Sequence, residues 1–170
     1  LLAEDLLSPC TEEVAVFKQF SRLVNQARRT FVVMDTAPTG HTLLLMDAAG
    51  SYHREIARNM PDGAHYATPM MRLQDPDYTR ILLVTLPETT PVLEAGILED
   101  DLKRAGIHPW AWVINQSLAA ATTTSPLLRH RATQESGPVD SVRERASRLA
   151  IVPLLHEAPI GPERLALLAS

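Results

Sequence analysis

The sequence is short of the residues that build several common kinds of site. Its 170 residues contain one cysteine and seven glycines. A single cysteine cannot form an internal disulfide or fill a four-ligand zinc site, so disulfide-stapled scaffolds and zinc fingers are excluded. Neither a glycine-rich phosphate loop nor a Gly-x-Ser-x-Gly nucleophile motif occurs. The histidines also lack the His-Glu-x-x-His spacing of a metal site.

Positive charge and long apolar runs are scarce as well. Lys and Arg number 16 against 20 Asp and Glu, and the formal net charge is -4. Nucleic-acid binding usually needs a basic face, so we expect no nucleic-acid partner. No run approaches the roughly 20 apolar residues that span a bilayer. The N-terminus has no initiator Met and no signal-peptide pattern, so we expect a cytoplasmic segment from the middle of a longer chain.

What is present is the composition of an ordinary globular protein. Hydrophobic residues make up 45% of the chain and charged residues 21%. This length and balance predict a single partial domain over residues 1–170, with enough apolar side chains for a packed core.

Apolar spacing and turn residues predict alternating strands and helices. Short apolar runs predict buried strands at residues 31–34, 81–86, 110–114 and 149–152. Helical spacing, caps and prolines predict helices over about residues 9–28, 90–106, 126–135, 142–147 and 162–168, with a break at Gly137-Pro138. Residues 59–79 are expected to be an irregular excursion with short helical pieces. Alternation of this kind is typical of an α/β fold with a parallel sheet covered by helices on both faces.

Polar residues and prolines follow each predicted strand. Residues 35–36 are Asp-Thr, residues 85–87 Thr-Leu-Pro, residues 115–116 Asn-Gln and residues 153–154 Pro-Leu. Ligands bind beyond the carboxyl ends of parallel strands, so these residues are expected to converge on one binding rim.

The segment at residues 35–42 has two interpretations. A carboxylate after a buried strand can orient water around Mg²⁺, and the hydroxyls beside it can face phosphate oxygens. Alternatively, Asp35 only caps the next helix and Pro38 with Gly40 forms a turn, and composition alone favours that interpretation.

Cys10 likewise has two interpretations. It lies in the first turn of a predicted helix, where unpaired N–H groups and the helix dipole favour a thiolate, a good ligand for soft metals and metalloids. Without further information a small buried residue at a helix start is the more common case.

Three segments carry a family resemblance. Residues 35–42 are Asp-Thr-Ala-Pro-Thr-Gly-His-Thr, residues 8–13 are Ser-Pro-Cys-Thr-Glu-Glu, and residues 85–95 are Thr-Leu-Pro-Glu-Thr-Thr-Pro-Val-Leu-Glu-Ala. Together they closely resemble the arsenical pump-driving ATPases, the soluble catalytic subunits of arsenite and antimonite efflux pumps. The resemblance covers essentially the whole chain, which is similar to the second of the two homologous halves of such proteins without its beginning. It implies an incomplete P-loop NTPase-like sheet that lacks the P-loop strand.

The same resemblance implies three sets of site residues. The metalloid ligands are Cys10 and His41, with Ser8 beside them. The relay between nucleotide and metalloid consists of Asp35, Thr36, Thr39 and Gly40. The adenine-binding residues are Asn115, Pro153 and Leu154.

The resemblance also implies cofactors and partners. ATP and Mg²⁺ are the expected cofactors, and arsenite or antimonite acts as an allosteric metalloid. The expected partners are the missing N-terminal portion, the homologous half and an integral membrane arsenite permease, which would hold the protein at the periphery of the inner membrane. The exposed edges of an incomplete sheet also predict self-association.

Two departures from the family qualify its implied function. The family's P-loop and acidic switch residue are absent from these 170 residues, so no catalytic residue is assigned and the chain alone is expected to be inactive. The alternative function is that of the related targeting ATPases for tail-anchored membrane proteins, which share the signature at residues 35–41. Those relatives use a Cys-x-x-Cys pair and a Met-rich groove, and this sequence has no such pair and no clear groove.

Overall fold

A computed structural model describes residues 9–36, 50–51, 58 and 67–166 of the chain. The described residues belong to two compact units. The first unit draws on residues 1–80 and 101–108, and the second on residues 81–100 and 109–170. That residues 1–170 fold as one partial domain stays a prediction.

The described part of the first unit includes the helices α2 (Pro9–Gln26) and α4 (Pro69–Gln74). Helix α2 begins at the proline that the sequence places in the first turn, which confirms the predicted start. Phe20 and Val24, one turn apart, are buried, and α2 packs against α4.

Side-chain hydrogen bonds fix the chain around α4. The hydroxyl of Thr68 caps the helix by accepting from the backbone N of Met71 at 3.3 Å. The Tyr78 hydroxyl donates to the carbonyl of Val24 on α2 at 2.6 Å. These contacts confirm the expected short helical piece within residues 59–79, of which residues 59–66 lie outside the described part.

Residues 31–34 do not form the predicted buried strand. They have no regular structure, and Phe31 is 91% exposed and Val33 78% exposed. An apolar run becomes a strand only when a neighbouring strand supplies partners for its N–H and C=O groups. No strand pairs with this run among the described residues.

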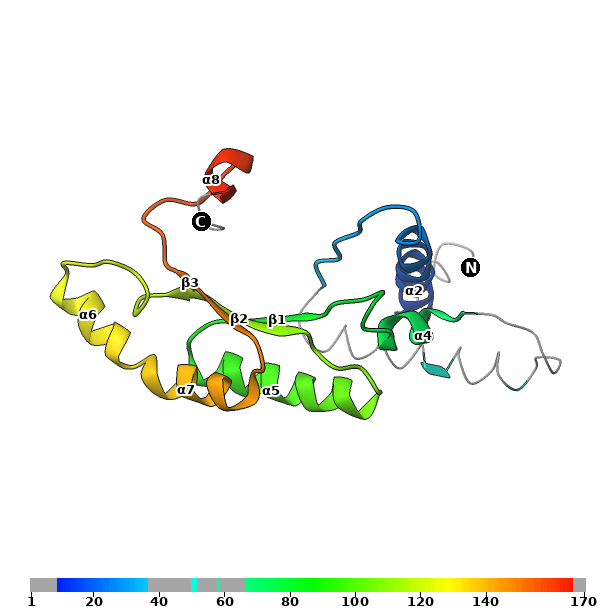
Figure 1. Cartoon of the computed structure of the whole chain (residues 1–170), viewed down its shortest axis with the longest axis horizontal. Helices are drawn as coiled ribbons and strands as arrows, with labels where there is room; N and C mark the ends of the chain where they lie inside the picture. The colour runs from blue at the N-terminus through cyan, green and yellow to red at the C-terminus, as the bar shows by residue number, and fades with distance from the viewer. Residues whose placement is uncertain (1–8, 37–49, 52–57, 59–66, 167–170) are drawn as a thin grey trace. The chain divides into compact units, whose positions relative to one another are not determined.

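The second unit contains a parallel sheet of three strands (Figure 1). Its strands are β1 (Leu82–Thr85), β2 (Ala111–Ser117) and β3 (Leu149–Pro153), in that order across the sheet. Leu83 pairs with Trp112, and Trp112 with Leu149. The parallel α/β architecture and three of the predicted strands are thereby confirmed.

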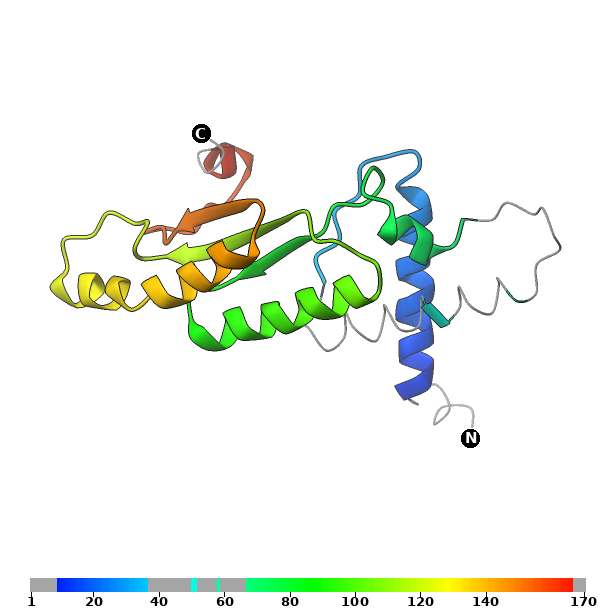
Figure 2. The same cartoon turned by 60° about the horizontal axis from the view of Figure 1, so that its bottom comes forward.

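Helices α5 (Thr89–Arg104) and α7 (Ser136–Arg145) run along the same face of this sheet (Figure 2). Leu83 and Thr85 of β1 are buried, whereas Leu82 is 49% and Val84 60% exposed. The prediction that this strand is buried on both faces is therefore wrong. Its side chains alternate between buried and exposed, as in a strand with one covered face.

The predicted helix break at Gly137-Pro138 is also wrong. Helix α6 (Pro126–Thr133) ends earlier, and α7 begins at Ser136, so both residues lie in the first turn of α7. Proline is tolerated there because first-turn N–H groups have no partner within the helix. A last helix, α8 (Pro162–Ala166), begins where the sequence predicts. Over the described residues, no helix has the length and apolarity needed to cross a membrane.

A buried charge cluster joins α5, α7 and β2. Glu99 on α5 is 3% exposed, and its Oε2 accepts from Arg145 Nη1 at 2.9 Å. The same guanidinium donates to Asp100 at 3.1 Å, and the Trp112 indole N–H donates to Glu99 Oε1 at 3.3 Å. The hydrogen bond to Asp100, and then that to Glu99, raises the pKa of Arg145 above its ordinary value. A Cβ at Gly96 would lie in van der Waals contact with this guanidinium, at 3.4 Å.

Candidate functional site

A pocket of about 380 Å³ lies at the carboxyl ends of the three strands. Leu86 and Pro87 follow β1, Gln116 and Leu118 lie at the end of β2, and Leu154 follows β3. The other lining residues come from the helices and their turns, namely Glu88, Thr89, Arg131, Gln134, Glu135 and Pro138. The predicted convergence of the strand ends on one rim is confirmed for these three strands.

The end of β2 is irregular where it reaches the pocket. The pairing of β2 with β3 shifts register between Ile114 and Ser117, so the strand continues past Asn115, where the sequence predicted its end. Gln116 adopts a φ of 58°, in the left-handed region that residues other than glycine rarely adopt. Asn115 Oδ1 accepts from the backbone N of Gln116 at 3.0 Å and holds this turn. This register shift and turn place Gln116 at the pocket.

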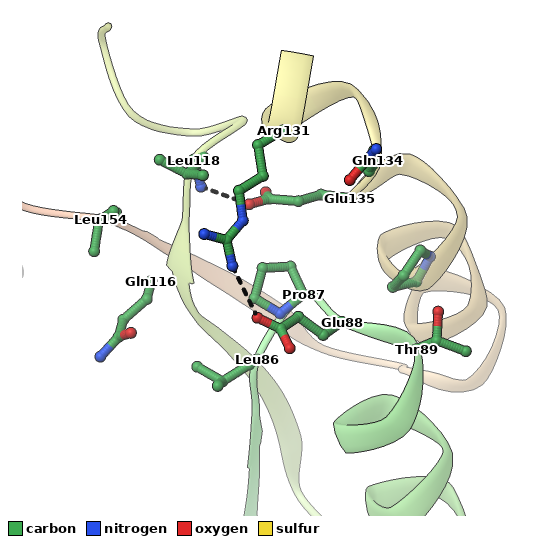
Figure 3. A pocket seen from close by; sticks show the side chains of 11 residues that line it. Leu86, Pro87, Glu88, Thr89, Gln116, Leu118, Arg131, Gln134, Glu135 and Leu154 are labelled. Carbon is green, nitrogen blue, oxygen red and sulfur yellow. Dashed lines mark hydrogen bonds and ion pairs between the residues drawn. The ribbon is translucent and has the colours of Figure 1, made fainter. Parts of the chain in front are cut away.

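Glu135 holds the loop that follows β2 (Figure 3). Its side chain is 6% exposed. One carboxylate oxygen accepts from the backbone N of Leu118 at 2.9 Å. The other accepts from the Ser117 hydroxyl at 2.8 Å and from the backbone N of Ala119 at 3.1 Å. A buried carboxylate is stable only when its oxygens are satisfied in this way.

The charged side of the pocket is open to water. Arg131 and Glu88 point toward each other across it and form an ion pair at 3.7 Å (Figure 3). Their side chains are 66% and 58% exposed, so the pair contributes little to stability. It does place one positive and one negative group at the edge of a hollow whose other described lining residues are leucines, prolines, glutamines, Thr89 and the buried Glu135.

This lining suits binding better than covalent chemistry. The described lining residues of the pocket include no cysteine, histidine, tyrosine or serine, and its leucines and prolines offer contact surface. The amides of Gln116 and Gln134 can each donate and accept hydrogen bonds. A flat ring with polar edges matches such a surface.

Comparison with known proteins identifies the family. The sequence profile of the anion-transporting ATPases matches residues 1–72 and 50–170. The chain belongs to the anion-transporting ATPase family. An arsenical pump-driving ATPase of Escherichia coli is 64% identical over 99% of this chain, and one of Acidiphilium multivorum is 63% identical over 97%. ATPase GET3A of Arabidopsis thaliana is a more distant relative, 25% identical over 92% of the chain.

The chain spans less than a third of the arsenical pump-driving ATPases it matches and about half of ATPase GET3A. It covers 29% of the Escherichia coli protein and 55% of ATPase GET3A. Family membership confirms the resemblance carried by residues 8–13, 35–42 and 85–95.

The adenine-binding residues expected in this family member lie at or beside the pocket. Leu154 lines it, and its backbone N donates to the carbonyl of Ser117 at 2.8 Å, which ties the exit of β3 to the end of β2. Pro153 is the last residue of β3. Asn115 is half-buried and acts on Gln116 rather than lining the pocket. Their roles toward adenine stay predictions.

Of the predicted relay residues, the structure describes Asp35 and Thr36, which are exposed residues of the first unit. The described lining residues of the pocket belong to the second unit. Thr39, Gly40, His41 and Ser8 lie outside the described residues. Cys10 lies in the first turn of α2, and its side chain is outside what the structure describes. Where the structure does describe side chains, no three His, Cys, Asp or Glu gather as metal ligands.

Sequence reasoning missed the residues that build the far wall of the pocket. Glu135 was expected only as the end of a helix, and Arg131 and Gln134 carried no signal at all. Arg131, Gln134 and Glu135 are distant in sequence from both β2 and β3. Only the connection between these strands, which contains α6 and α7, brings the three residues to the strand ends. Gln116 could be found, because it follows a predicted strand.

Proposed function

We propose that this chain is part of a metalloid-stimulated ATPase, and that the pocket receives the adenine ring of ATP. The observation that carries the proposal is the position and lining of the pocket. It lies beyond the carboxyl ends of parallel strands, where α/β proteins bind nucleotides. Its volume of about 380 Å³ is within the range of small-molecule sites, roughly 300–1,000 Å³.

The lining residues have distinct roles in this proposal. Leu118 and Leu154 pack against the faces of the ring, and the amide of Gln116 reads a polar edge of it. Asn115 keeps Gln116 in its left-handed turn, and Pro153 delivers Leu154 from β3. These roles agree with the adenine-binding set that the family resemblance implies.

The phosphates need a different set of residues. Among the described lining residues Arg131 is the one cation, and it is paired with Glu88. A triphosphate in transfer needs denser positive charge, which family members supply from a P-loop, and Mg²⁺ would neutralise charge on the phosphate oxygens. The 170 residues contain no P-loop motif. We therefore propose that the chain by itself hydrolyses no ATP.

The metalloid and transport functions are proposed from family membership. Cys10 and His41, with Ser8 nearby, bind arsenite or antimonite, since a thiolate and an imidazole suit a soft metalloid. Asp35, Thr36, Thr39 and Gly40 relay between nucleotide and metalloid. The intact ATPase drives efflux through a membrane permease at the cytoplasmic face of the inner membrane. Self-association of the chain stays a prediction.

A chimera tests the proposal. These 170 residues replace the matching segment of the Escherichia coli arsenical pump-driving ATPase, with which they share 64% identity. ATP hydrolysis is measured with and without antimonite, in the chimera, in its Cys10→Ser variant and in the isolated chain. We expect antimonite to raise the rate of the chimera, no such increase in Cys10→Ser, and no hydrolysis by the isolated chain.

A Glu144→Gln chimera is the matched control, because Glu144 is an exposed residue of α7 away from the pocket. It should respond to antimonite like the parent chimera. Hydrolysis without any antimonite response would refute the metalloid function and favour the targeting alternative. Hydrolysis by the isolated chain would refute the assignment of the phosphate site to residues outside it.

A further inference from the structure

The buried carboxylate of Glu135 has no role in the functions described so far. It lines the pocket, yet it is 6% exposed and is engaged with three donors of one short loop. We infer that Glu135 is a positioning residue, which holds residues 117–119 in the shape that binds a nucleotide base. This inference rests on the proposed adenine-binding role of the pocket.

The hydrogen bonds show why the loop depends on this residue. The backbone N–H groups of Leu118 and Ala119 and the hydroxyl of Ser117 all point at the same carboxylate. The Ser117 oxygen in turn accepts from the backbone N of Ala120 at 3.2 Å. The Ser117 hydroxyl and the backbone N–H groups of residues 118–120 are thus satisfied, directly or through Ser117, by one side chain from another part of the chain.

The geometry requires a carboxylate and not an amide. One oxygen of Glu135 faces the N–H of Leu118, and the other faces the N–H of Ala119. In a glutamine of the same size, one of these positions becomes an NH₂ group, which is a donor only. Whichever way the amide turns, a donor then faces a backbone donor. Glu135→Gln therefore loses at least one backbone hydrogen bond with almost no change in volume.

Residues 117–119 include one lining residue of the pocket and adjoin another. Gln116 precedes Ser117, and Leu118 is itself part of the wall. The carbonyl of Ser117 also accepts from the backbone N of Leu154, a third lining residue. If residues 117–119 lost these hydrogen bonds, the loop would have to become ordered when the ligand binds. The entropy cost of that ordering weakens affinity.

The test measures loop order and affinity separately in the 170-residue chain. Backbone amide NMR gives the hydrogen exchange of Leu118 and Ala119 without ligand, and titration with ATP gives Kd. In Glu135→Gln we expect exchange of both amides to accelerate about tenfold or more. We expect Kd to rise about tenfold, which corresponds to about 1.4 kcal/mol. Glu144→Gln, the same substitution at an exposed site of α7, should change neither.

A second pair of variants keeps the inference testable if Glu135→Gln does not fold. Ser117→Ala removes the hydroxyl from the network, and Ser141→Ala removes an exposed hydroxyl of α7 that donates to the carbonyl of Gly137. Ser117→Ala should raise Kd about threefold relative to Ser141→Ala.

The outcomes separate the inference from the proposed function. If the parent chain does not bind ATP, the adenine role of the pocket fails and the positioning role fails with it. If the parent binds ATP and Glu135→Gln binds it equally well despite faster exchange, Glu135 only stabilises the fold and the inference alone is overturned. Equal Kd values for Ser117→Ala and Ser141→Ala would overturn it as well.

Discussion

Replacing Arg145 by methionine should destabilise the second unit far more than replacing Arg143, two residues earlier on α7, by methionine. Arg145 neutralises Glu99, whose side chain is buried, whereas Arg143 pairs with exposed Asp140 at 2.9 Å. Arg143→Met removes one ion pair between exposed groups, whereas Arg145→Met removes two, to Asp100 and to Glu99. The substitutions differ in whether a buried carboxylate loses an arginine partner.

The expected magnitude follows from these contacts. A hydrogen bond to a charged group contributes about 1.5–3 kcal/mol. The guanidinium of Arg145 is 41% exposed, which moderates the loss, and Glu99 keeps the hydrogen bond from the Trp112 indole N–H. We expect Arg145→Met to lower the free energy of unfolding by about 2 kcal/mol. The exposed pair of Arg143 is worth about 0.5 kcal/mol or less.

Urea unfolding followed by tryptophan fluorescence measures this difference. Trp112 is 2% exposed and hydrogen-bonded to Glu99, so its emission reports the region that is perturbed. With a slope of about 2 kcal/mol per M, the midpoint of Arg145→Met should fall by about 1 M. Because the pKa of Arg145 is raised, the stability that its ion pairs contribute is lost only as the pH rises through that raised value. Deprotonation of Arg145 should therefore not change the stability difference between parent and Arg145→Met from about pH 6 to about pH 9.

A second substitution checks the physical reason. If the loss comes from a buried carboxylate that no longer has its arginine partner, Glu99→Gln in the Arg145→Met background should restore about 1 kcal/mol, because an amide is less costly to bury. Equal losses for Arg145→Met and Arg143→Met, or no recovery in the double variant, would refute the reasoning.

Two further predictions concern the pocket and the first unit. Gln116→Gly should relieve the left-handed backbone at φ 58° and raise the free energy of unfolding by about 0.5–1 kcal/mol, measured in urea. The Kd for ATP should rise in this variant because the side-chain amide is lost. Unchanged affinity would exclude Gln116 from ligand contact. Tyr78→Phe removes the 2.6 Å hydrogen bond to the Val24 carbonyl and should lower the stability of the first unit by about 1 kcal/mol in thermal unfolding followed by circular dichroism. An unchanged melting curve would contradict a role for this hydroxyl.

Much of the second unit was determined by local sequence. Apolar runs of strand length, separated by helical spacing and by caps such as Ser125-Pro126, predict β1, β2, β3 and the helices between them. The residues that follow these strands then have to meet, because parallel strands end on the same edge of a sheet. The place of the pocket was therefore predictable from the sequence, and so was the contribution of Gln116 and Leu154 to its rim.

Tertiary structure decided the rest, because it depends on partners distant in sequence. The run at residues 31–34 has the composition of a strand, but no neighbour pairs with it among the described residues. Gly137-Pro138 has the composition of a break, but its position in the first turn of α7 makes the proline harmless. The pairing of Glu135 with the loop after β2 and of Arg145 with Glu99 has no local signature. A buried charge is tolerated only where hydrogen-bond partners lie beside it in the folded protein. The packing of helices and strands places those partners, and no short segment of sequence determines it.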